Sequence, residues 1–332
     1  MRPYKQVFRR NAEPLQSVDD RDRDRTRHAA TAARHVLRRG VGEEFDALKA
    51  VVETVAQQAC PGSPYLAERE IRRVSSTDNQ TLWEEAHRTA RRILLNLFDH
   101  LAMLTVALTG PRVPLYAHMT VSRVTAEAAA QICNLLSPTA GYQERVLRAA
   151  RLGLRSRSLE VSAIHDLPDG HPVKVHALET TTRARDEFVA MVRRAGLDVR
   201  LRGDGRPAGI RRPGAGEYLR LDPSLTDLVN EQFPDRPAGY QLTSGVVHSM
   251  EWMLRDAITE DDADGIRAAP DLLGIGSATL VAVGAAAAVA EVYARLYGHD
   301  PAAAAAASAT RRSRIDQACV QEFNRLHRIR PQ

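Results

Sequence analysis

Two segments of the chain carry polar side chains at four-residue intervals, and these are the residues whose types could do chemistry. Arg123 and Glu127 lie in the first segment, and Tyr240, Ser244 and His248 lie in the second. Residues four apart share one side of a helix, so each set forms one polar stripe. Histidine is the side chain that can gain or lose a proton near neutral pH. These five residues are therefore the candidate polar network.

The remainder of both segments, 115–138 and 240–254, is mostly apolar or small. A helix that is apolar on most sides lies inside a protein, where each polar group must find a partner. We predict that the two stripes face each other, with a charged residue of the first within about 4 Å of a polar side chain of the second. Such a network either fixes the register of the helices or forms a ligand or catalytic site, and the sequence leaves both open.

Arginines are concentrated in two other places, which together could form a basic face for RNA, DNA or an acidic partner. These arginines are Arg145, Arg148, Arg151, Arg155, Arg157, Arg200, Arg202, Arg206, Arg211 and Arg212. Few aromatic residues that could stack on bases lie near them, with only Tyr142 and Tyr218 close in sequence. The alternative is that these arginines are solvated residues on helix surfaces.

The sequence gives little support for metal or cofactor chemistry. Cys60, Cys133 and Cys319 are far apart, without the Cys/His spacing of a zinc site. Glu84 and His87 have the spacing of half a di-iron site, but no second Glu-x-x-His exists. Motifs of phosphate-binding loops, dinucleotide-binding folds and serine hydrolases are missing. We therefore predict no metal and no cofactor, and the isolated cysteines indicate a reducing cytoplasm.

Composition indicates a globular chain. It has 332 residues, 44% of them hydrophobic, which is enough to bury a core. The net charge of +5 comes with an arginine-rich, lysine-poor composition, and we attribute it to genome composition rather than to nucleic-acid binding. No apolar run opens the chain, so no secretory signal is expected. The stretch 272–290 lacks charge, but its many Ala and Gly residues favour a buried helix over a membrane span.

The periodicity of apolar residues predicts an all-α protein. Helices are expected at 25–39, 43–59, 82–108, 115–138, 142–162, 177–195, 240–254, 272–297 and 303–328. The short link at 109–114 makes an antiparallel pair of its two flanking helices. Alternating residues and a Gly-Asp-Gly turn predict a β-hairpin near 196–216. We expect a flexible charged arm at 1–24, then a single domain at 25–330: a multi-helix bundle of long antiparallel helices with a small β-hairpin insertion.

The chain resembles a group of uncharacterised actinobacterial all-helical proteins, on the segments PLYAHMTVSRVTAEAAAQICNLLSP, RVLRAARLGL, PSLTDLV and YQLTSGVVHSMEW. The recurrent elements of that group are an Arg-x3-Glu helix and a Tyr-x3-Ser-x3-His helix; the resemblance covers about 82–297 and implies no activity. More distantly, the Ser-x3-His element is similar to HEPN-like helical domains of bacterial defence and toxin systems. Members with ribonuclease activity have an Arg shortly before the His, where this chain has Gln241, Leu242 and Thr243.

These observations favour a cytoplasmic helical binding or accessory protein without an intact catalytic motif. The alternative is a HEPN-like enzyme or defence effector that acts on nucleic acid through His248, with Arg123 brought to it by the fold. Expected partners are a protein or a second copy of the chain, with nucleic acid on the basic face as another option, and no membrane.

Overall fold

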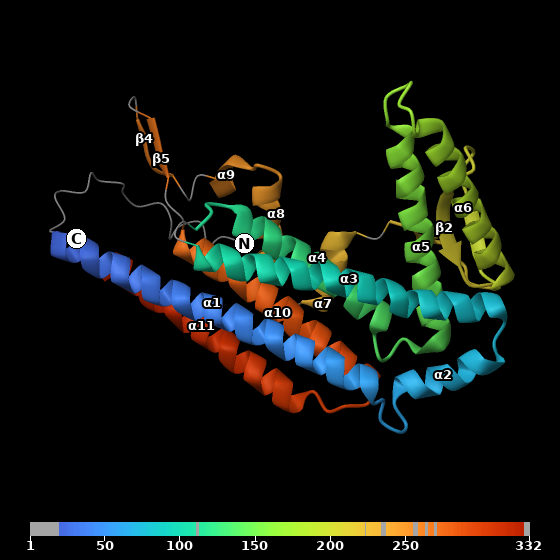
Figure 1. Ribbon diagram of the computed structural model, residues 1–332, viewed down its shortest axis with the longest axis horizontal. Helices are drawn as coiled ribbons and strands as arrows, with labels where there is room; N and C mark the ends of the chain where they lie inside the picture. The colour runs from blue at the N-terminus through green and yellow to red at the C-terminus, as the bar shows by residue number, and fades with distance from the viewer. Residues whose placement is uncertain are drawn as a thin grey trace.

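The computed structural model describes residues 20–110, 113–222, 224–233, 237–254, 258–262, 265–268 and 271–328 (Figure 1). This part of the chain is mainly helical and carries two small antiparallel sheets. The prediction of a helical protein with a small β insertion is confirmed. The predicted arm lies outside the described residues except for 20–24, which already belong to helix α1 (Asp20–Gln57).

Long helices make up most of the fold, and short helices and strands connect them. The other long helices are α3 (Thr77–Thr109), α4 (Ala117–Leu136), α5 (Gly141–His165), α6 (Lys174–Arg194), α10 (Leu272–Leu296) and α11 (Ala302–Arg328). The short helices are α2 (Pro64–Val74), α7 (Leu225–Gln232), α8 (Pro237–Val247) and α9 (Glu251–Leu254). The strands are β1 (Asp198–Leu201), β2 (Pro207–Arg211), β3 (Leu219–Arg220), β4 (Ile258–Asp262) and β5 (Gly265–Ala268).

Helix α1 runs unbroken where two helices were predicted, at 25–39 and 43–59. The predicted interruption at 40–42 is therefore absent. Gly40 lies against α11, and a Cβ atom there would be 2.7 Å from Cδ1 of Ile315. The glycine therefore permits close approach of two helices, and this packing offsets its low helix propensity.

The larger hydrophobic core lies between α1, α3, α4, α10 and α11, which run side by side along the length of the molecule (Figure 1). Helix α10 packs against α1, α4 and α11, and its Val283, Ala286 and Val289 are completely buried. The predicted packing of 272–296 inside the helical core is therefore present. By length and apolar composition alone, α3 and α10 are also long enough to cross a membrane.

A second core lies where α5 and α6 stand away from α1, α3, α4, α10 and α11 (Figure 1). It includes Phe188 of α6 and the strand residues Val199 and Ile210, which are partners in the β1–β2 register. The predicted hairpin near 196–216 is confirmed, and β3 adds a third strand to it. The β4–β5 hairpin was not predicted, because its acidic first strand reads as a loop.

Candidate functional site

Helices α4 and α8 pack against each other and bring the two predicted polar stripes together. Arg123 Nε donates to Oε1 of Glu127 over 2.8 Å, and Arg123 Nη2 donates to the Tyr240 hydroxyl over 3.3 Å. The Tyr240 hydroxyl in turn donates to the same Glu127 oxygen over 2.8 Å. The guanidinium carbon also lies 5.3 Å from the centre of the Tyr240 ring, within cation–π range. The three side chains thus form a closed triangle, and the predicted contact between the stripes is present.

The triangle is only partly shielded from water. The side chains of Arg123 and Glu127 are 16% and 20% exposed, whereas Tyr240 is buried. Burial raises the pKa of Tyr240, and the hydrogen bond to Glu127 raises it further. Burial alone would lower the pKa of Arg123, but its bonds to Glu127 and Tyr240 raise it overall. The arginine therefore stays charged and the tyrosine stays neutral, which is the state that this geometry requires.

His248 lies at the outer edge of the triangle, 3.3 Å from Arg123 Nη1 through its Nε2 atom. Arginine is a permanent donor, so His248 Nε2 is the acceptor in this contact. His248 is exposed, and its backbone amide donates to the carbonyl of Ser244 over 3.0 Å. The structure therefore joins Arg123, Glu127, Tyr240 and His248 through side chains, and Ser244 contributes a backbone carbonyl.

Helix α8 ends at Val247, directly before His248, although a continuous helix was predicted for 240–254. Ser249 is in the left-handed region with φ 53°, and it is the one non-glycine residue of the described segments with positive φ. The amides of Ser249 and Met250 donate to the carbonyls of Val246 and Gly245, which is a Schellman cap. Glycine usually occupies this cap position. The serine conceals the helix end in the sequence, and this explains the wrong prediction.

A small apolar cluster fixes the turn after α8 against its neighbours. Met119 of α4, Val246, Met253 and Ala278 of α10 are buried together. Tyr116 donates its hydroxyl to the carbonyl of Leu254 over 2.5 Å, which ties the end of α9 to the start of α4. The turn is therefore held on both sides, and its outward side chains have a defined position.

The outward side of this turn combines polar and apolar groups. Val247, His248 and Met250 are exposed, and Met250 is 47% accessible. Of these residues, His248 contacts the Arg123 triangle. We call residues 247–250 the α8 turn.

The predicted basic face needs a correction, because Arg145 is completely buried. It donates to both carboxylate oxygens of Glu68 and to the carbonyls of Leu135 and Ser137. A buried arginine requires such a set of acceptors. Arg145 therefore joins α2, α4 and α5 in the interior and cannot contact a partner.

Most other members of the predicted face have acceptors within the chain. The ion pairs are Arg148 with Glu144, Arg155 with Asp222, Arg206 with Asp204, Arg211 with Asp198, and Arg212 with Glu144. Arg151 donates to the carbonyl of Arg220, Arg157 lies over the Phe188 ring and Arg200 over the Tyr218 ring. Arg202 is exposed, and its backbone amide donates to the carbonyl of Arg206 in the turn between β1 and β2. Arg151, Arg155 and Arg212 attach α5 to the sheet region, and most of the others pair locally, so a free basic surface is weaker than predicted.

The half di-iron spacing has a structural explanation. Glu84 pairs with Arg72, and His87 makes edge contacts with the rings of Tyr65 and Trp83. Burial, together with the charges of Arg145 and Arg91, lowers the pKa of His87 to about 3. Within the described residues, no group of three His, Cys, Asp or Glu side chains could hold a metal ion.

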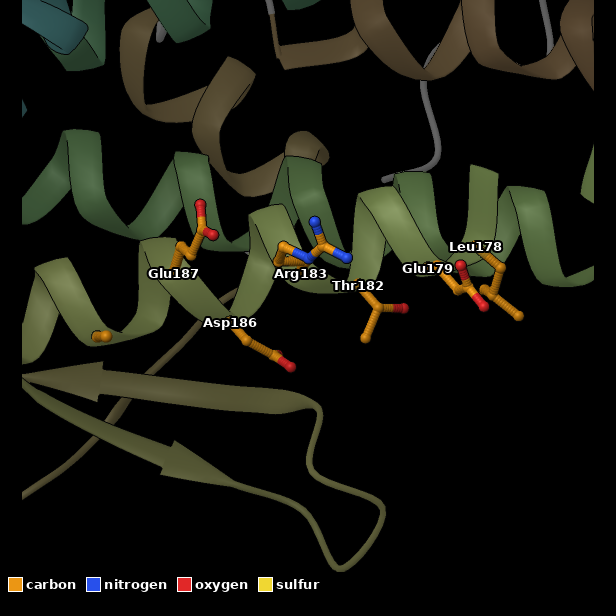
Figure 2. Close-up of a pocket in the computed structure, with 7 residues that line it drawn as sticks. Leu178, Glu179, Thr182, Arg183, Asp186 and Glu187 are labelled. Atoms are coloured by element: carbon orange, nitrogen blue, oxygen red, sulfur yellow. The ribbon is translucent and has the colours of Figure 1, made fainter. Parts of the chain in front are cut away.

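An open depression lies on the outer side of α6, beside the β1–β2 hairpin (Figure 2). All of its lining side chains come from α6: Leu178, Glu179, Thr182, Arg183, Asp186, Glu187 and Ala190. A surface from one helix cannot enclose a ligand, so we regard it as an exposed helix face.

No known protein family, curated protein or solved structure matches this chain.

Proposed function

We propose that this chain is a non-catalytic helical binding protein of the cytoplasm and that it binds a protein partner at the α8 turn. The observation that carries the proposal is the position of His248, exposed among Val247 and Met250 and held by Arg123. Arginine, methionine and aromatic residues are enriched in protein interfaces, where a few preorganised side chains carry most of the binding energy.

The Arg123 triangle supports a positioning role. Two of its three guanidinium nitrogens donate to Glu127 and Tyr240, and the third faces His248. Because the side chains already satisfy one another, the triangle orients His248 without itself reaching a ligand.

The helices α1, α3, α4, α10 and α11 supply the rigid support in this proposal, as one bundle of long antiparallel helices. Their common core supports that arrangement. The three cysteines are free thiols, which supports a reducing compartment.

Cross-linking tests the proposal directly. A photoreactive benzoylphenylalanine replaces Met250 in one variant and Val74, which is 88% exposed at the end of α2, in a matched control. Both variants are irradiated in an extract of the native host, and the adducts are identified by mass spectrometry. The cross-linking is then repeated with the purified partner. We expect one defined protein adduct from position 250 only. The captured protein is either another protein or a second copy of this chain. Equal adducts from both positions, or none, would refute a binding site here.

A second candidate function rests on the 3.3 Å contact between Arg123 and His248. The contact supplies the Arg–His combination that the HEPN-like resemblance requires, from two helices instead of one motif. Incubation with labelled RNA beside His248→Ala tests it. Cleavage that disappears in the variant would establish the enzyme and displace the binding proposal.

A further inference from the structure

A cavity of about 220 Å³ lies between α1, α10 and α11, away from the α8 turn. The end of α7 contributes Phe233 to its wall, and Val51 of α1 and Ala287 of α10 add further apolar surface. An engineered apolar cavity of about 150 Å³ holds benzene. This cavity therefore has room for an aromatic ring with a small substituent.

Gly284 of α10 lines the cavity and explains part of its volume. A Cβ atom built there would have no atom within 4 Å, so no neighbouring helix requires a glycine at this position. Glycine is disfavoured inside a helix compared with alanine. The space in front of Gly284 is open, and a larger side chain would fill it.

Two polar groups of α11 line the same cavity without partners among the described residues. Ser308 is only 2% exposed, and its hydroxyl makes no hydrogen bond. The Nε atom of Arg312 is also buried and makes none. Residues four apart lie on one side of a helix, so both groups can reach the same ligand atoms. Buried polar groups are normally satisfied, and both of these could donate to an acceptor oxygen of a ligand.

The other charges around the cavity neutralise one another. Glu44 pairs with Arg311 over 2.6 Å, and Glu291 pairs with Arg295 over 2.6 Å. No acidic side chain pairs with Arg312 in the part of the chain that the structure describes. Arg312 is therefore the lining arginine whose guanidinium has no acidic partner among the described residues.

From these observations we propose that the cavity binds a small organic monocarboxylate with a compact apolar body. Its carboxylate pairs with Arg312 and accepts from the Ser308 hydroxyl, and its body lies against Val51, Phe233 and Ala287. A single free guanidinium suits one carboxylate, whereas a phosphate dianion would need more donors. This site is independent of the proposed protein-binding function.

Calorimetric titration with sodium benzoate tests the proposal. We expect saturable binding to the wild-type protein, at least about tenfold weaker binding of uncharged benzamide, and a similar loss of benzoate binding in Arg312→Gln. Gly284→Leu should abolish binding by filling the cavity. Arg314→Gln, which changes an exposed arginine of the same helix, should bind like the wild type.

The variants distinguish a site from non-specific anion binding. Gly284→Leu removes a helix glycine and should fold well. If that variant does not fold, the benzoate affinity of Arg312→Gln still tests the site. Absence of benzoate binding to the wild type, equal affinity for benzamide, or unchanged binding in both variants would overturn the proposal.

Discussion

Arg145 and Glu68 form a two-point ion pair inside the protein, with Nε 2.7 Å from Oε2 and Nη2 2.8 Å from Oε1. Their side chains are 0% and 4% exposed. Trp83 Nε1 also donates to Oε2 of Glu68 over 2.7 Å. The pair thus links α2, α3 and α5 where the two hydrophobic cores meet.

Loss of one partner of this pair should destabilise the fold strongly. We expect Arg145→Met to lower the unfolding free energy by about 3–5 kcal/mol, because it leaves Glu68 buried without its cation. Arg148→Met, the control on the same helix, breaks a more exposed pair and a bond to the Asn134 carbonyl, and should cost about 2 kcal/mol or less. Urea denaturation measures both. The double variant Arg145→Met with Glu68→Gln should recover part of the loss, and equal losses for the two arginines would contradict this account.

His87 should make stability depend on pH. The folded chain keeps it neutral down to a pKa of about 3, whereas the unfolded chain binds a proton below about 6.5. Stability is therefore full above pH 6.5 and falls as the pH drops towards 3, by up to about 2 kcal/mol at pH 5. His87→Phe should flatten the urea-denaturation profile in this window, and His176→Gln, which retains His87, should keep it. An identical profile in His87→Phe would exclude His87 as the cause.

The three cysteines should react differently with a thiol reagent. Burial raises the pKa of Cys133 to about 12 and that of Cys319 to about 11, so neither forms much thiolate at pH 8. Cys60 is only half-buried. Dithiobis-nitrobenzoate should thus modify one thiol quickly in the folded protein and all three after unfolding. Fast reaction of a second thiol, or of any thiol in Cys60→Ser, would disagree with the packing.

Glu127→Ala should cost about 1–3 kcal/mol, since the triangle is partly exposed and Arg123 can still reach water. Tyr240→Phe should cost about 1 kcal/mol. Because both residues share one network, the double variant should cost less than the sum, with a coupling of about 0.5–3 kcal/mol by urea denaturation. Additive losses would mean that the side chains do not act together.

Part of this structure follows from local sequence. The helical period, the Gly-rich hairpin and the two polar stripes are properties of short segments. The contact between the stripes of α4 and α8 could therefore be predicted from the sequence. The N-cap of α7 is also local, since the Ser224 hydroxyl accepts the amide of Asp227, three residues later, over 3.1 Å. The single-domain boundaries at 25–330 stay a prediction.

The remaining features depend on contacts between distant segments. Arg145 looks like Arg148 in sequence, and only Glu68, which lies 77 residues away, determines that it is buried. The cavity likewise joins four helices, so no spacing in the sequence relates Gly284 to Ser308. Both cases require the packed fold.

The central claim is that Arg123 holds His248 in place at a protein-binding turn. The most direct measurement is the yield of the cross-linked adduct from a probe at position 250. This yield is compared between the wild-type background and Arg123→Met, at a temperature below the melting temperature of the variant. We predict that the yield with the same partner falls about tenfold or more, as for an interface hot spot, while the fold is retained. An unchanged yield in the folded variant would contradict the claim.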